Sequence, residues 1–295
     1  MFLAEFGLTG SWMQSATASQ TSSDVSRRGL LAGVGSLAAA PALAATETPA
    51  AAAVIGQEAW LAYEARLNAR LADAGGGAFA PRMERELLTL TNAARGAIGA
   101  AACAWSDELA RTARAHAADL AARGYVEHLS PEGFDPTHRV GLIARRMIGS
   151  ASENIAYRRA SEPVTAPDLM GIWRKSEPHW LNLLRPSHEQ VGFGVAVRGE
   201  RTYTVGLYAR PDGELGAPLP FRLEGEAALS RALVEASPRI ESFALADPLD
   251  EDARQAMAER AAGRSLAPGV YQLRPRRKVS ERRYEILWGP IFVKV

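Results

Sequence analysis

Apolar residues recur every three or four positions in three segments ahead of residue 125, which is the spacing of an amphipathic helix. These segments cover residues 57–77, 81–99 and 105–124. Each runs into a glycine-containing stretch, where we expect the helix to stop. The predicted inward faces are Trp60, Tyr63, Leu67 and Leu71; Met83, Leu87, Leu90 and Ala94; and Leu109, Ala113, His116 or Ala117, and Leu120.

The middle of the chain combines a loop, a helix and a hairpin. Residues 128–140, HLSPEGFDPTHRV, have the Pro and Gly content of a loop. A helix is predicted over 165–176, with Thr165 as its N-cap. Residues 191–197 and 202–209 alternate apolar and small residues around the connection RGER, which predicts a β-hairpin. This order of elements favours α+β layers over a parallel α/β sheet.

From Gly216 onward the pattern changes. The predicted elements are a Pro/Gly-rich entry over 216–223, a helix around 225–236, a strand over 240–246, a helix over 249–264, and strands over 269–275 and 282–295. This is enough for a small α+β unit. The basic stretch RPRRKVSERR is expected to be a solvated hairpin turn rather than a nucleic-acid patch.

The stretch SRRGLLAGVGSLAAAPALAA, residues 26–45, predicts export. Arg27-Arg28 precedes a weakly hydrophobic run rich in Ala and Gly, and Ala42-Leu43-Ala44 closes it, which is the order found in a twin-arginine signal peptide. A short buried helix with a basic start is the structural alternative. We expect cleavage after Ala44 and a periplasmic or secreted mature protein.

These features divide the chain into four parts. We expect a signal peptide over 1–44, a linker and short helix over 45–80, a main domain over 81–213 and a small C-terminal extension over 216–295.

Composition narrows the classes of function. Hydrophobic residues make up 47% of the chain and the formal net charge is +1, so a full core is available and nothing favours a nucleic-acid partner. Outside the N-terminal region no apolar run is long enough for a mature transmembrane helix. Cys103 is the only cysteine, so an intramolecular disulfide is excluded and a buried small hydrophobe is expected there. The oligomeric state is left open.

Histidine and glutamate fall in four polar segments: HLSP, SENIA, SEPHW and SHEQVG. None of the four contains a local zinc motif of the H-E-x-x-H kind, so any site must be assembled by the fold. The candidate residues are His128, Glu153, Glu177, His179, His188 and Glu189.

Several histidines and glutamates also have a structural interpretation. Glu153 follows Ser150 by three positions, which is the spacing of a capping box. His116, inside a helical run, is more readily a packing or surface residue than a ligand, and His138 beside a turn is similar. His188 precedes a strand, where exposure is expected.

His179 is the better candidate of the pair in SEPHW. On a helix, residues two positions apart point roughly 200° from one another, so Glu177 and His179 would not share a cleft. Pro178 favours a helix start with Ser176 as N-cap, which places His179 in the first turn. The helix dipole disfavours imidazolium there, and a neutral imidazole is the form that binds a metal or accepts a proton.

Six blocks between about Met83 and Pro211 together resemble the CAP domain (SCP-like), in its cysteine-free bacterial branch. This family includes cysteine-rich secretory proteins, antigen 5 and plant pathogenesis-related class 1 proteins. The resemblance implies an α+β fold, an α-β-α sandwich with a central antiparallel sheet, and a groove lined by two His and one or two Glu. The blocks are LLTLTNAARGAIG, ELARTARAHAADLAARG, HLSPEG, ENIA, SEPHWLNLL and VGFGVAV.

By this resemblance, HLSP supplies His128 to the groove and ENIA supplies Glu153. SEPHWLNLL stands in place of the bacterial S-P-G-H-R-x-N-I-L block. It supplies His179 and puts Asn182 at the asparagine position.

Within the bacterial block, Glu177-Pro178 replaces Pro-Gly and Trp180 replaces Arg. In addition, His188-Glu189-Gln190 stands where the family has aromatic-Thr-Glu before the Val-Gly strand, which leaves the fourth groove position open. The candidates for the fourth position are Glu177 and Glu189.

Two His and a carboxylate around an open position suit a divalent metal, zinc by ligand type, with calcium or magnesium as alternatives. His128, Glu153 and His179 are the predicted metal ligands and the candidate catalytic residues. The sequence has no serine elbow, and the family has no agreed enzymatic activity. We therefore expect an exported, non-enzymatic protein that binds a lipid, glycan or protein of the cell envelope. The alternative is a metal-dependent hydrolase acting on envelope peptides or polysaccharides.

Overall fold

The computed structural model describes residues 56–249, 266–281 and 283–295. The predicted signal peptide, its cleavage site and most of the linker lie outside the described residues, as does nearly all of the helix predicted over 249–264. None of the helices in the described ranges is long and apolar enough to cross a membrane.

Seven helices lie in the described ranges: α1 (Gln57–Asp73), α2 (Pro81–Gly96), α3 (Asp107–Arg123), α4 (Pro136–Ile143), α5 (Ala166–Arg174), α6 (Glu177–Leu184) and α7 (Ala227–Val234). The central sheet consists of β1 (Ala78–Phe79), β2 (Ala104–Trp105), β4 (Ala151–Arg159), β5 (Gln190–Arg198) and β6 (Arg201–Ala209). A separate two-stranded ladder joins β3 (Met147–Ile148) to β7 (Gly213–Glu214). The C-terminal sheet consists of β8 (Arg222–Leu223), β9 (Ser242–Ala246), β10 (Gly269–Ser280), β11 (Arg283–Ile286) and β12 (Ile291–Lys294).

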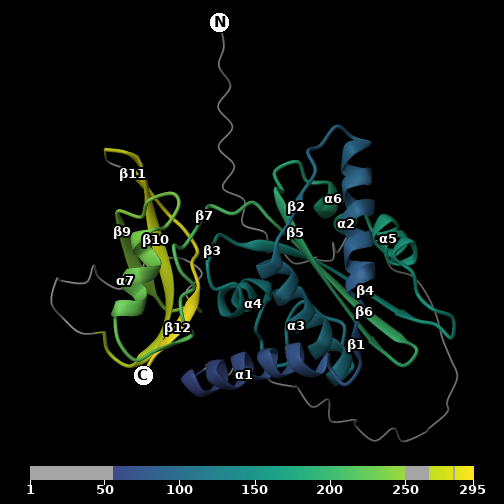
Figure 1. The fold of residues 1–295 in the computed structure, drawn as a ribbon, viewed down its shortest axis with the longest axis horizontal. Helices are drawn as coiled ribbons and strands as arrows, with labels where there is room; N and C mark the ends of the chain where they lie inside the picture. Colours follow the sequence, from purple (N-terminus) through teal and green to yellow (C-terminus); the bar gives the residue numbers. More distant parts are fainter. Residues whose placement is uncertain (1–55, 250–265, 282) are drawn as a thin grey trace, which may run out of the picture. The chain divides into compact units, whose positions relative to one another are not determined.

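The central sheet has the order β1-β5-β6-β4, and β2 adds a short parallel pairing to β5. β5 and β6 form the predicted antiparallel hairpin, with Gly192 opposite Leu207. Figure 1 shows α3 on one face of this sheet and α2, α5 and α6 on the other. The predicted α+β sandwich is therefore confirmed.

Side-chain alternation along β5 decides which helix packs on which face. Val191, Phe193 and Val195 are buried in the same cluster as residues of α2, α5 and α6. Gly192 and Gly194 point the other way, toward α3. A Cβ at Gly192 would lie 2.1 Å from the backbone nitrogen of Ala110, so only glycine allows α3 to approach this closely.

α1 packs through the face that the sequence predicted. Trp60, Tyr63 and Leu67 are buried in one cluster with Phe134 of the loop that follows α3. The Tyr63 ring stacks on the Phe134 ring with centroids 4.3 Å apart. The same cluster contains Phe221, Ile291 and Val293 from the C-terminal region.

The C-terminal sheet has the order β11-β10-β12-β8, and β9 pairs with β10. The structure thus confirms a C-terminal α+β region, with Leu229 of α7 packed in one cluster with Leu273 and Phe292. The single strand predicted over 282–295 is wrong in one respect. The segment containing Pro290, which cannot donate a backbone hydrogen bond, divides it into β11 and β12.

Two further expectations are corrected. The loop predicted over 128–140 includes the start of α4, because Asp135 is its N-cap: the Asp135 carboxylate accepts from the backbone N–H of His138, and the two residues form a capping box. Glu153 does not form a capping box with Ser150, since it lies in strand β4 opposite Leu207 of β6.

Candidate functional site

The loop between α3 and α4 carries His128. α3 ends at Gly124, which has a φ of 71°, a conformation that glycine adopts without strain. The His128 side chain is 52% exposed, and its Nδ1 lies 2.8 Å from Oε1 of Glu153. The fold therefore brings together two predicted site residues from segments 25 positions apart.

Glu153 projects from β4 into the protein, and its side chain is only 1% exposed. Nη2 of Arg139 donates to both carboxylate oxygens at 3.0 Å. Burial alone would raise the pKa of Glu153, but Arg139, His116 and His128 outweigh it and lower the pKa to about 2. The carboxylate is consequently ionised and held from two sides.

Arg139, on α4, links this carboxylate to the His128 loop. Its guanidinium is buried and donates from Nη2 to the backbone oxygen of His128 at 2.8 Å. Nη1 donates to the backbone oxygen of Phe134 at 3.0 Å. One side chain thus fixes both the position of the loop and the charge state of Glu153.

His116 of α3 lies beneath the pair. Its Nε2 is 3.2 Å from the backbone oxygen of Glu127 and 3.9 Å from Oε1 of Glu153. Its Nδ1 is buried and has no hydrogen-bond partner in the described part of the chain. Burial, followed by the charge of Arg139, lowers the pKa of His116 to about 3. His116 is a neutral packing residue.

His179 sits in the first turn of α6, as predicted. Its Nδ1 is 2.8 Å from Oγ of Ser176, so the hydroxyl contacts this imidazole rather than capping a backbone N–H of the helix. Burial lowers the pKa of His179, and nearby His128 lowers it further. The predicted neutral form is supported, although burial rather than the helix dipole is the largest cause.

Asn182 is linked to the backbone of His179 through Asn154. It is 8% exposed, and its Nδ2 donates to Oδ1 of Asn154 at 2.9 Å. Nδ2 of Asn154 in turn donates to the backbone oxygen of His179 at 2.9 Å. Asn182 therefore helps to position α6 against β4.

The remaining candidates lie apart from this arrangement. His188 is 5% exposed, which corrects the expected exposure, and its Nε2 is 3.2 Å from Oδ1 of Asn182. Glu189 is exposed and pairs with Arg210 at 3.2 Å, and Glu177 is exposed at the start of α6. Across residues 56–249, 266–281 and 283–295, no group of three or more His, Cys, Asp or Glu side chains is arranged to hold a metal ion.

Residues 88–208 match the cysteine-rich secretory protein family, abbreviated CAP. This range runs from within α2 to β6 and contains all six candidate residues. Residues 88–208 form a CAP domain. Its single cysteine, Cys103, is free and is buried, as predicted.

Relatives of the CAP domain include the uncharacterized protein YkwD of Bacillus subtilis strain 168, with 29% identity over 119 residues. That match covers 39% of this chain and 43% of YkwD, so this chain spans less than half of its relative. An extracellular protein containing a SCP domain from Bacillus anthracis is 25% identical, covers 44% of this chain and 41% of its own, and has a TM-score of 0.36. A structure of NaASP2 with Zn2+ is 13% identical, covers 44% of this chain and 80% of its own, and has a TM-score of 0.34.

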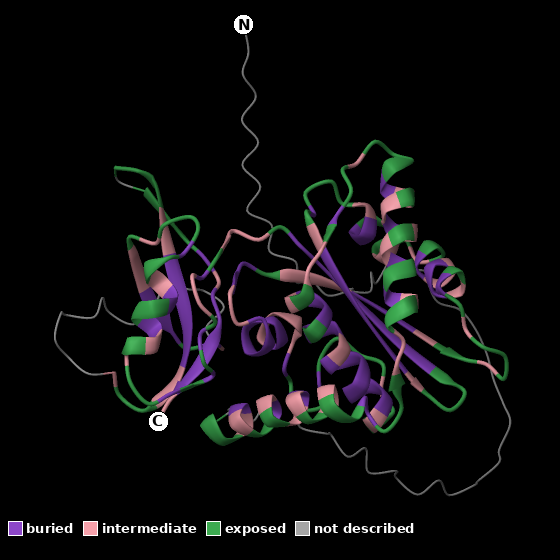
Figure 2. Cartoon of the chain, viewed as in Figure 1, coloured by how far each residue is buried: buried purple, intermediate pink, exposed green. Residues whose placement is uncertain are grey.

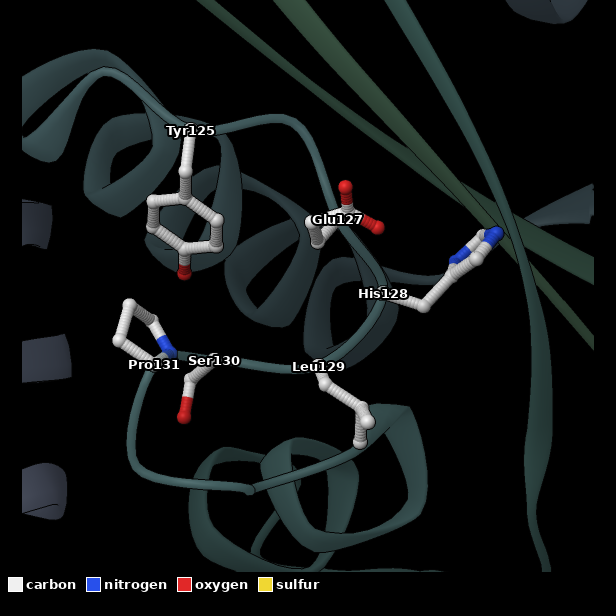
Figure 3. Close-up of a pocket in the computed structure, with 6 residues that line it drawn as sticks. All are labelled: Tyr125, Glu127, His128, Leu129, Ser130 and Pro131. Carbon is white, nitrogen blue, oxygen red and sulfur yellow. The ribbon is translucent and has the colours of Figure 1, made fainter. Parts of the chain in front are cut away.

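A surface pocket of about 490 Å³ lies in the His128 loop of the CAP domain. Figure 3 shows Tyr125 and Pro131 on one side and Leu129 on the other, while the imidazole of His128 points away from them. The Tyr125 hydroxyl donates to Oδ2 of Asp119 at 2.8 Å, which fixes the ring. Leu129 is 51% exposed, so the pocket offers apolar contact on the side of the loop away from the imidazole.

Sequence reasoning missed Arg139 and gave His116 no part in the site. Arg139 follows the Asp-Pro helix start by three positions, and that capping signal could have placed it on the first turns of α4. Nothing local in the sequence indicates that its guanidinium is buried against Glu153.

Proposed function

We propose that the protein is exported and that its CAP domain binds a lipid, glycan or protein ligand of the cell envelope around His128 and His179, without catalysing a reaction. One observation carries this proposal: the carboxylate of Glu153 is already engaged by Arg139 and His128. The twin-arginine stretch at residues 26–45 supports export.

An engaged carboxylate of this kind positions other groups. A general base must accept a proton near the working pH, and Glu153 has a pKa of about 2. Its role is to accept the Nδ1–H of His128, which orients the imidazole and leaves Nε2 for a ligand. Tyr125, Leu129 and Pro131, in the same loop, offer apolar contacts that suit an acyl chain or the apolar face of a sugar.

The side chains at this site fit a divalent metal ion held by two ligands, His128 and His179, rather than by the three predicted ligands that included Glu153. Nδ1 is engaged in both cases, by Glu153 for His128 and by Ser176 for His179. A carboxylate behind a histidine is the usual second layer of a zinc ligand, so His128 and His179 would hold the ion through Nε2 and Glu153 would orient His128. Imidazole ligands favour zinc, whereas calcium and magnesium prefer oxygen. A bound zinc ion would supply Lewis acidity.

The His128–Glu153 pair also favours the alternative function. A carboxylate that orients an imidazole is the arrangement of a general base acting on water. A metal-dependent hydrolase of envelope peptides or polysaccharides would use His128 in this way.

Zinc titration by calorimetry, followed by sedimentation with peptidoglycan sacculi and with vesicles of envelope lipid, separates these functions. We expect one zinc ion per chain, lost in the double variant His128→Ala/His179→Ala and retained in Glu189→Gln, the matched exposed control. We also expect sacculi or vesicles to bind the parent and not the double variant. Binding to neither would overturn the binding proposal. Zinc-dependent release of fragments from sacculi, abolished by His128→Ala, would establish the hydrolase instead.

A further inference from the structure

The helix that carries Arg139 packs against the C-terminal region. α4 contacts β12, and Figure 2 shows both elements as largely buried. Leu142 and Ile143 of α4 lie in one apolar cluster with Ile291 and Val293 of β12. One face of α4 is therefore part of an interface between the CAP domain and the C-terminal region.

Gly141 lets β12 approach α4 closely. A Cβ at Gly141 would lie 2.9 Å from both Cδ1 and Cγ1 of Ile291, well inside the ordinary contact distance of two carbon atoms. Ile291 is 0% exposed, so its side chain has little room to move aside. The spacing between α4 and β12 therefore depends on the absence of a side chain at position 141.

Arg145, just beyond the end of α4, fixes the same spacing with hydrogen bonds. Its Nη1 donates to the backbone oxygen of Ile291 at 2.9 Å and to that of Gly141 at 2.6 Å. Its Nε donates to the backbone oxygen of Leu219, which also belongs to the C-terminal region, at 2.7 Å. The guanidinium thus joins the last turn of α4 to two segments of the C-terminal region.

The position of α4 matters to the site because Arg139 lies two residues before Gly141. Arg139 donates to the backbone oxygens of His128 at 2.8 Å and of Phe134 at 3.0 Å, both in the loop between α3 and α4. These bonds have the usual length, so a movement of the donor by a fraction of an ångström weakens them. Since packed interiors transmit strain, a shift of α4 against β12 reaches the His128 loop through Arg139.

We propose that the contact of β12 with α4 positions the His128 loop, and that the C-terminal region thereby sets the affinity of the CAP domain for its ligand. Gly141, Arg145 and Ile291 are positioning residues, because they act through Arg139. The second part of this proposal rests on the proposed function, since it takes His128 as part of the binding site. It gives the C-terminal region, outside residues 88–208, a role in binding.

Hydrogen exchange and zinc titration of the full chain test the two parts separately. Gly141→Ala adds the Cβ that would collide with Ile291. We expect faster exchange in residues 125–134, with a larger increase there than in β5 and β6, because the displacement is local. We also expect zinc binding to weaken by about tenfold, the lower end of the effect of losing a group that supports a metal ligand.

A compensating substitution separates the position of the loop from the stability of the protein. In Gly141→Ala/Ile291→Ala the colliding Cγ1 and Cδ1 are gone, and the remaining Cβ at position 291 lies 3.6 Å from the new one, an ordinary contact. Exchange in the loop and zinc affinity should return toward the parent values. The truncated core side chain should nevertheless keep the double variant less stable than the parent in urea.

Gly171→Ala on α5 is the matched control, because a Cβ there would meet nothing within 4 Å, and it should change neither readout. Unchanged exchange in residues 125–134 of Gly141→Ala would overturn the proposal, as would a double variant whose loop exchanges as fast as that of Gly141→Ala. Faster exchange with unchanged zinc affinity would overturn the second part. A parent that binds no zinc would overturn the zinc site and that second part, whereas the exchange results would still decide the first.

Discussion

Replacing Arg139 by methionine removes a buried guanidinium while keeping a side chain of similar length. Arg139 and Glu153 are each about 1% exposed, and Nη2 of Arg139 contacts both carboxylate oxygens at 3.0 Å. The variant therefore leaves an ionised carboxylate in the interior with only His128 as partner. Breaking a buried pair from one side costs about 3–5 kcal/mol of unfolding free energy, and we expect that loss at pH 7.

The pH dependence of this loss identifies Glu153 as its cause. In the parent the folded-state pKa of Glu153 is about 2, below the ordinary value of 4.5. A lowered carboxyl pKa contributes stability that is present above pH 4.5 and is lost as the pH falls toward 2. From that shift the contribution is about 3 kcal/mol, of which about 2 kcal/mol is gone by pH 3. The deficit of Arg139→Met should shrink by a similar amount between pH 7 and pH 3.

Urea unfolding followed by circular dichroism at pH 7, 5, 4 and 3 measures this deficit. The double variant Arg139→Met/Glu153→Gln should recover part of the lost stability at pH 7, because no buried charge remains. Arg145→Met is the matched control: Arg145 is half-buried, and its side-chain hydrogen bonds go to backbone oxygens such as those of Leu219 and Ile291. Its deficit should change little with pH. A deficit for Arg139→Met under about 1 kcal/mol, or one that is constant from pH 7 to pH 3, would refute the reasoning.

Two further changes test burial and packing. His116 has a folded-state pKa of about 3 against an ordinary 6.5, so its stabilising contribution is lost as the pH falls from 6.5 toward 3. His116→Gln should therefore make the free energy of unfolding, measured in urea, depend less on pH in this range. An unchanged pH dependence would contradict the burial of a neutral imidazole. Gly192→Ala would bring a Cβ within 2.1 Å of the Ala110 nitrogen and should lower the free energy of unfolding, measured in urea, by at least about 3 kcal/mol. Gly171→Ala on α5, where a Cβ would meet nothing within 4 Å, should raise it by up to about 1 kcal/mol. Equal effects of the two substitutions would contradict the close approach of α3 to β5.

Helices with their own periodicity and caps were predictable from local sequence. α3 begins after Ser106, whose hydroxyl accepts from the Leu109 amide, and it ends at Gly124, in the glycine-containing stretch where the sequence predicted a stop. α4 was missed because the Pro and Gly content of residues 128–140 outweighed the Asp135-Pro136 start signal. β4 was missed because Glu153 and Ser150 have capping-box spacing, whereas the pairing that makes this segment a strand comes from β6, some fifty residues away.

The His128–Glu153 contact was expected from the resemblance to the CAP domain, and the structure places the two residues 2.8 Å apart. Whether they form a binding site stays a prediction. The role of Glu153 as an orienting group was not foreseen, because that role depends on Arg139. Sequence spacing of 14 residues says nothing about a guanidinium and a carboxylate meeting inside the core.

The buried face of α2 differs from the predicted one because this face contains charged residues. A periodicity argument counts Arg and Glu as exposed, so it selected Met83, Leu87, Leu90 and Ala94. The fully buried residues are instead Glu84, Leu87, Thr91 and Arg95. Arg95 is enclosed because its guanidinium satisfies backbone oxygens, including those of Leu183 and His188, near the end of α6. Those acceptors lie about ninety residues away, so the stability of a buried cation at this position is a property of the assembled fold and leaves no periodic signal in the helix itself.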